Sequence, residues 1–178
     1  MIGRRRRPPV ELLDESMFAV RLDSDERAVI STLLGELEEL LTDAEQGTTS
    51  PTVTRLFPPA FTDHEGVHVE ENDEYERLMR TELVASRRAA LRTVRTRLES
   101  QELGHIAMTA PELTAFMQSL NALRLTLGSI LGVTDDDDDD NDLSDSPESV
   151  LFQWCGWMLE WVVSALSTTL PTEGGTLA

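Results

Sequence analysis

Four stretches of the chain place apolar residues every three or four positions, which is the spacing of an amphipathic helix. They predict helices at residues 23–44, 72–100, 109–132 and 147–170. A shorter stretch, residues 16–22, alternates apolar and polar positions and predicts one β-strand, which we expect to pair near Val53. We therefore expect an all-α fold, a bundle of four main helices with a short N-terminal β-strand.

Residues at the predicted helix ends support these boundaries. Asp23 or Ser24 can cap the first helix, and acids fill its first turn, where the helix dipole favours them. Thr109 and Glu112 have the spacing of a capping box at the start of the third helix, and Gly132 is a typical stop after its end. Ser146 or Pro147 begins the fourth helix.

The same periodicity predicts which side of each helix is buried. On the first helix it selects Val29, Leu33, Leu37, Leu40, Leu41 and Ala44, widened by Ile30 and Leu34. On the third helix it selects Leu113, Phe116, Met117, Leu120, Leu123, Leu127, Ile130 and Leu131. The fourth helix is apolar around most of its circumference, with a narrow polar strip of Gln153, Glu160 and Ser164. A helix of this kind is central in a bundle or lies at a subunit interface.

Arg124 falls on the apolar face of the third helix. A buried guanidinium needs a carboxylate and further acceptors, so we expect Arg124 to pair with an acid, with Glu160 as the first candidate. Trp154 and Trp161 join these two residues in the set that we expect to be structural.

The second helix carries the only strongly basic structured segment. Its arginines fall within an arc of ~140° when residues are placed 100° apart. They are Arg77, Arg80, Arg87, Arg88, Arg92 and Arg95, and the apolar side holds Tyr75, Leu78, Met79, Ala85, Ala89, Ala90 and Val94. Three interpretations are open for this arginine face: pairing with acids of neighbouring helices, exposure to solvent, or contact with phosphate or an acidic partner.

A long connection, residues 45–69, holds the motif RLFPPAF. Its apolar side chains favour packing against the domain, because each costs roughly 1.5–3 kcal/mol when left in water. A docking loop for a partner is the alternative, and Arg55, Phe57, Pro58 and Phe61 are its candidate contact residues.

Length and charge limit the domain organisation and the partners. The 178 residues suit a single helical domain at 11–170, with a disordered basic tail at 1–10, an acidic flexible loop at 134–146 and a disordered tail at 171–178. The net charge of −18 repels nucleic acid at long range and attracts basic protein surfaces. DNA is therefore a disfavoured partner.

The compartment is predicted from the cysteine content and the hydropathy. The single cysteine, Cys155, excludes an intramolecular disulfide and fits a reducing compartment. No apolar run reaches the ~18 residues of a membrane span, and the first residues lack a signal-peptide core. We expect a cytoplasmic protein with no membrane partner.

No motif in the sequence specifies a reaction, and we expect neither an enzyme nor a bound cofactor or metal. His64 and His68 lie among acids, but Gly66 and Val67 between them spoil a helical metal-binding pair. The acidic run 135–142 lacks the glycine and glutamate positions of an EF-hand loop. Cys155 lies on an apolar helix face, which is typical of a buried structural thiol.

Four sequence blocks resemble a known family. They are RLFPPAF with the following Asp63, EYERLMRTELVASRRAAL (residues 74–91), LNALRLTLG (residues 120–128) and WCGWMLEW (residues 154–161). In this order they are similar to an actinobacterial family formerly of unknown function, associated with the oxidative-stress transcriptional regulator AosR. The resemblance spans about residues 16–170 and implies a small cytoplasmic helical protein tied to transcription and redox metabolism. Redox-active members use a closely spaced cysteine pair, which Cys155 alone cannot provide within one chain.

We therefore expect a non-enzymatic regulatory protein that acts mainly through protein–protein contacts, with DNA contact as a secondary route. A sigma factor or RNA polymerase is the candidate partner, and a homodimer is the candidate assembly. The alternative is a protein-interaction adaptor without a transcriptional role.

Overall fold

The computed structural model describes residues 7–45, 51–56, 62–63, 66–67, 69–100, 104–133 and 146–169. Four long helices dominate it. They are α1 (Ser24–Glu45), α3 (Val69–Leu98), α4 (Ala110–Ile130) and α5 (Pro147–Ser167), and α2 (Pro51–Leu56) is a short fifth helix. The prediction of four main helices is confirmed, with each boundary within a few residues of its predicted position.

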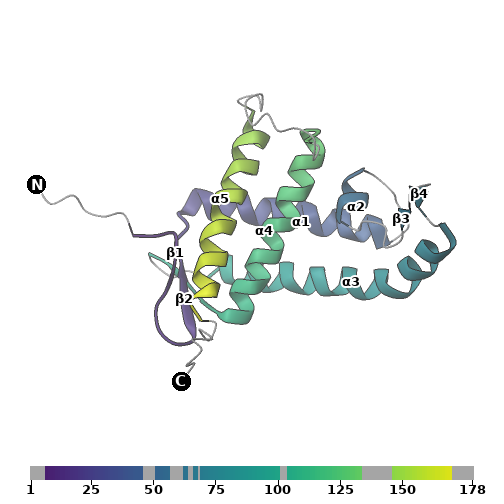
Figure 1. Ribbon diagram of the computed structural model, residues 1–178. Helices are drawn as coiled ribbons and strands as arrows, with labels where there is room; N and C mark the ends of the chain where they lie inside the picture. Colours follow the sequence, from purple (N-terminus) through teal and green to yellow (C-terminus); the bar gives the residue numbers. More distant parts are fainter. Residues whose placement is uncertain are drawn as a thin grey trace, which may run out of the picture.

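The helices form two pairs that cross each other (Figure 1). α4 and α5 pack side by side and run in opposite directions, joined at the end where α4 stops and α5 begins. α1 and α3 form the second pair and lie crosswise to the first, with α3 and α2 both packed on α4. This arrangement places α4 in contact with α1, α2, α3 and α5, and α5 at one side of the molecule.

A small sheet corrects the all-α prediction, although the protein is mostly helical. Its strands are β1 (Val10–Leu12), β2 (Met17–Val20) and β5 (Ile106–Thr109), antiparallel with β2 in the centre. A separate two-stranded pair is formed by β3 (Thr62–Asp63) and β4 (Gly66–Val67). The strand expected at residues 16–22 is β2, but its expected partner near Val53 is wrong because Val53 lies in α2.

The sheet is closed by local contacts that also hold the start of the described chain. Asp14 Oδ1 accepts hydrogen bonds from the backbone N–H groups of Ser16 (2.9 Å) and Met17 (3.0 Å), which forms the turn between β1 and β2. Arg21 donates from its backbone N–H to the Pro9 carbonyl at 2.8 Å and pairs with Glu11 through its side chain. Pro9 and Val10, which were expected in a disordered tail at 1–10, therefore have defined backbone contacts, while residues 1–6 lie outside the described residues.

The core joins the sheet to all four long helices, with buried side chains that include Phe18, Leu34, Leu91, Phe116 and Met158. On α1 and α4 most of the predicted buried positions are confirmed. Two are wrong: Val29 is 43% exposed and Ile130 is 63% exposed. Both lie at the edge of an apolar stripe, where the neighbouring helix no longer covers them.

On α3 the predicted apolar side is correct only in part. Val94 is buried and Ala90 is partly buried, as predicted, but Ala85 and Ala89 are exposed. Val84, Leu91 and Leu98, which were not selected, are buried. Alanine is a strong helix former at any position, so it marks a face poorly, while the larger aliphatic residues gain more from burial.

The predicted helix ends agree with the structure. Thr109 and Glu112 form the complete capping box of α4, and Ser146 caps α5 by accepting a hydrogen bond from the Ser149 N–H at 3.2 Å. At the end of α4, Gly132 adopts a φ of +70°, the left-handed conformation that glycine reaches without strain. Most of the acidic loop expected at 134–146 and the tail expected at 171–178 lie outside the described residues, as do His64 and His68.

Candidate functional site

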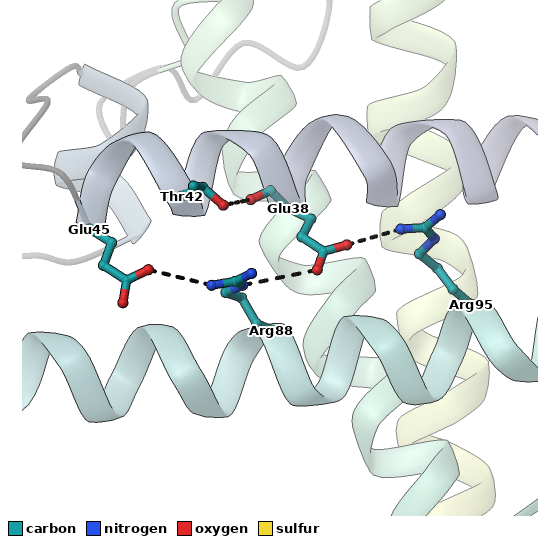
Figure 2. Close-up of polar contacts among 5 residues, drawn as sticks. All are labelled: Glu38, Thr42, Glu45, Arg88 and Arg95. Carbon is teal, nitrogen blue, oxygen red and sulfur yellow. Dashed lines mark hydrogen bonds and ion pairs between the residues drawn. The ribbon is translucent and has the colours of Figure 1, made fainter.

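Two of the predicted arginines of α3 are held by acids of α1 (Figure 2). Arg95 Nη1 donates to Glu38 Oε2 at 2.9 Å. Arg88 lies between two carboxylates, with Nη1 3.4 Å from Glu45 Oε2 and Nε 3.9 Å from Glu38 Oε1. Thr42 donates its hydroxyl to the backbone carbonyl of Glu38 at 2.9 Å. These contacts match the first of the three interpretations of the arginine face, pairing with acids of a neighbouring helix.

Arg87 is directed toward the core rather than toward solvent. Its Nη2 donates to the backbone carbonyl of Leu56, at the end of α2, at 2.8 Å. Burial lowers the pKa of the Arg87 guanidinium from its ordinary value. At 100° per residue, Arg87 lies ~60° from Val84, which places it on the buried side of α3. It therefore joins α2 to α3 and offers little to an external ligand.

Among the remaining arginines of α3, Arg92 is exposed, while the side chains of Arg77 and Arg80 lie outside the described residues. Arg97, which was not singled out from the sequence, pairs with Glu112 of the α4 capping box at 2.6 Å. Burial alone raises the pKa of Glu112, but hydrogen bonds from Thr109 and Arg97 bring it below its ordinary value. Glu112 therefore joins the end of α3 to the start of α4.

A polar groove of about 530 Å³ lies beside these ion pairs, between α1 and α3. Its lining residues are Gly35, Glu38, Glu39, Thr42, Asp43, Arg88 and Arg95. Three carboxylates face two guanidinium groups there, so the groove has a net negative charge and does not suit a phosphate. Within the described residues, no group of three or more His, Cys, Asp or Glu side chains could hold a metal ion.

The candidate docking loop is described only at its first residues. Leu56 is buried, as packing requires, and Phe57, Pro58 and Phe61 lie outside the described residues. Arg55 is half-buried and donates to the backbone carbonyl of Val133, just after α4. That carbonyl lies at the negative end of the α4 dipole, where a cation is favoured. Arg55 therefore has a structural contact within the chain.

Arg124 does not pair with Glu160, which corrects the expected ion pair. Its guanidinium carbon lies 4.6 Å from the centre of the Phe152 ring, on the neighbouring α5. Arg124 remains half-buried, so its charge stays partly hydrated and needs no buried carboxylate. Glu160 is exposed, about two turns further along α5 than Phe152.

Cys155 is buried, as expected of a structural thiol. Burial raises the pKa of this thiol to about 12, despite the nearby charge of Arg124. The protonated thiol is a poor nucleophile, so Cys155 is unsuited to catalysis or redox sensing in the folded state.

The two tryptophans expected to be structural have different roles. Trp154 is half-buried, and its indole N–H donates to Glu26 of α1 at 3.3 Å. Trp161 is 37% exposed, and Trp157 is 46% exposed. Trp161 and Trp157 therefore lie on the surface of the described structure.

The exposed tryptophans belong to one apolar face of α5, formed by Val150, Trp157 and Trp161, which we call the Trp face. Val150 is 61% exposed. The spacing of 7 and 4 residues places the three side chains above one another on one side of the helix. The predicted polar strip, Gln153, Glu160 and Ser164, is exposed along the edge of this face. The periodicity of α5 left open an interface position, but the sequence alone did not show which residues the other helices leave uncovered.

Comparison with known proteins gives one family. Residues 4–166 match the family described as "Domain of unknown function (DUF2017)". No curated protein and no solved structure matches the chain. Within the described residues, none of the helices combines the length and apolar character needed to span a membrane.

Proposed function

Because the chain belongs to the DUF2017 family, a domain of unknown function, we propose its role from the structure: a non-enzymatic regulatory protein that acts through protein–protein contacts. The observation that carries this proposal is the Trp face of α5. Monomeric proteins seldom leave two tryptophans exposed on one helix face, and aromatic residues are enriched where proteins bind one another.

The arginine contacts support a protein partner over DNA. A phosphate contact needs an arginine whose charge is available, and Arg88 and Arg95 already face Glu38 and Glu45. The net charge of −18 adds a long-range repulsion of nucleic acid. Arg92 is the exposed arginine left on the described part of this face, and one such charge binds DNA weakly.

A role in transcription is the finer part of the proposal. This part comes from the resemblance of four sequence blocks to the family associated with AosR. The partner that we propose on this basis is a sigma factor or RNA polymerase. The buried thiol of Cys155 argues against redox sensing by this chain alone. A protein-interaction adaptor without a transcriptional role uses the same surface and is the second candidate.

One experiment tests both parts. The wild-type chain and the Trp157→Ala/Trp161→Ala variant are immobilised and incubated with an extract of the source cells, and the bound proteins are identified by mass spectrometry. Sigma factors or RNA polymerase subunits are expected among the proteins that the wild type retains. If only proteins unrelated to transcription are recovered, the result supports the adaptor. If no protein is recovered, the result contradicts both candidates.

DNA binding is checked separately by fluorescence anisotropy with a labelled duplex at low and high salt. We expect no binding at either concentration. Binding at low salt that is lost at high salt, and weakened by Arg92→Gln, would restore direct DNA contact as the regulatory route.

A further inference from the structure

The Trp face has a definite size and shape. Val150 and Trp161 are eleven residues apart on α5, so the stripe is about 16 Å long, or three helical turns. Trp157 lies near the middle of this stripe and Trp161 at its far end. They are 46% and 37% exposed, so a partner can cover a little less than half of each indole. A surface of this length suits a short helix laid along α5.

The charged side chains of α5 are all acidic, since this helix carries no arginine or lysine. Glu160 is exposed beside the Trp face, ~60° from Trp157 around the helix, whereas Glu148 lies on the opposite side, ~160° from Val150. On the other edge of the face, next to Trp154, the first turn of α1 contributes two more acids, Asp25 and Glu26. None of the ion pairs within the described residues involves Glu160 or Glu148.

The sequence of the C-terminal part of the chain has the same sign of charge. From Leu125 to the C-terminus the chain contains eleven acids and no arginine or lysine. A basic partner is therefore attracted to the part of the chain that contains α5.

We infer that the Trp face binds a basic amphipathic helix of a partner protein, an inference that rests on the proposed function. The apolar side chains of such a helix pack on the indoles. Its flanking arginines or lysines meet Glu160 on one edge of the face and the first turn of α1, with Asp25 and Glu26, on the other. An arginine can also stack on an exposed indole. A second copy of this chain fits less well, because it brings the same net charge of −18 to the interface.

A defined peptide tests this inference on the full-length chain. The probe is a fluorescein-labelled peptide of about 18 residues whose leucines line one helical face and whose arginines cover the other. A scrambled peptide of the same composition has the same charge but no apolar face. Fluorescence anisotropy gives the dissociation constant, and the emission of the tryptophans should shift to shorter wavelength when the peptide covers them.

We expect the amphipathic peptide to bind about tenfold or more tightly than the scrambled one. Trp157→Ala/Trp161→Ala should weaken binding by a similar factor. Glu160→Arg should also weaken peptide binding, and by a larger factor at low salt than at high salt. The matched control, Val29→Ala/Val163→Ala, removes two apolar side chains outside the Trp face, one on α1 and one on another side of α5. They are 43% and 52% exposed, and their removal should leave the affinity unchanged. Circular dichroism checks that each variant keeps its helical fold.

Three results contradict the inference. Equal affinity for the scrambled peptide means that charge alone attracts it, and unchanged affinity of the tryptophan variant means that another surface binds. A dimer of the wild type that the tryptophan variant abolishes, measured by sedimentation equilibrium, means that a second copy covers the Trp face.

The peptide experiment and the extract experiment together distinguish a failure of the binding site from a failure of the proposed function. If the wild type and the tryptophan variant retain the same transcription proteins from the extract, the proposed function stands and the Trp face is not its site. If the peptide binds the Trp face but the extract yields no transcription protein, the site stands and the role in transcription does not.

Discussion

Arg95 on α3 donates a 2.9 Å hydrogen bond to the carboxylate of Glu38 on α1. The same carboxylate lies 3.9 Å from Nε of Arg88, about two helical turns away from Arg95 on α3. One acid thus joins two arginines of a neighbouring helix (Figure 2). This relationship turns a basic helix face, which from the sequence alone is a candidate phosphate site, into part of the packing between α1 and α3.

Glu38→Gln should lower the free energy of unfolding by about 1 kcal/mol, because it removes the shared acid of this network while its partners remain partly hydrated. For a chain of this size that corresponds to a melting temperature lower by about 2–4 °C. Glu39→Gln is the matched control, since Glu39 is its exposed neighbour and makes none of the ion pairs within the described residues. Thermal denaturation at low and high salt measures both variants. Equal melting temperatures for the two variants would show that the network adds nothing to stability.

Gly128 and Gly35 should respond differently to alanine. A Cβ at Gly128 of α4 would lie 3.1 Å from Cε2 of Phe152 and 3.3 Å from Nη1 of Arg55, whereas a Cβ at Gly35 of α1 meets nothing within 4 Å. Alanine is favoured over glycine within a helix by about 1 kcal/mol, so Gly35→Ala should raise the melting temperature by about 2–4 °C. At Gly128 the crowding offsets this gain.

The difference between the two glycine variants is measured by urea denaturation, and we expect about 1 kcal/mol or more. If Gly128→Ala stabilises the protein as much as Gly35→Ala does, the close approach of α4, α5 and α2 at Gly128 is looser than the structure shows.

Arg124 should be coupled to Phe152 and not to Glu160. The guanidinium stacks on the Phe152 ring at 4.6 Å, and such contacts contribute about 0.5–2 kcal/mol depending on hydration. Double-mutant cycles with Arg124→Gln, Phe152→Leu and Glu160→Gln measure the two couplings from unfolding free energies. A coupling to Glu160 as large as that to Phe152 would restore the ion pair that the place of Arg124 on the apolar face of its helix suggested.

Features of the fold that depend on neighbouring residues were predictable from the sequence. The capping box of Thr109 and Glu112 acts over three residues, and the helix periodicity acts over one or two turns, so both can be read from a short segment. β1 and β5 were missed because such short segments, of three and four residues, carry no distinct pattern of their own. They become strands through pairing with β2, which joins Phe18 to Met108 across the chain.

The candidate site shows the same limit. The sequence suggested that arginines of α3 pair with acids, but the identity of Glu38 and Glu45 depends on how α1 lies against α3. Glu160 was chosen as the partner of Arg124 from its place on α5, and the position of α5 along α4 brings Phe152 there instead. The sequence likewise indicated that α5 is apolar around most of its circumference, but it could not show that Trp157 and Trp161 are exposed. Their exposure depends on which side of α5 the other helices cover.

Cys155 should make the free energy of unfolding fall as the pH rises in the alkaline range. Its pKa is raised from 9.0 to about 12 by burial, so the unfolded chain loses the thiol proton at a lower pH than the folded chain does. The stability that the protonated thiol contributes is fully present below pH 9 and is lost as the pH rises toward 12. The free energy of unfolding should therefore fall across this window by up to about 1.4 kcal/mol per pH unit from this group.

The variant Cys155→Ala separates this effect from the titration of other groups. It should be less stable than the wild type at pH 8, because a buried side chain is truncated, but its stability should fall less steeply between pH 9 and 12. Urea denaturation at several pH values measures the two slopes. The same burial predicts that a thiol reagent labels the native wild type slowly at pH 8 and quickly once urea unfolds it. Parallel slopes for the two proteins, together with rapid labelling of the native chain, would mean that the thiol is accessible and that redox chemistry at Cys155 has to be considered again.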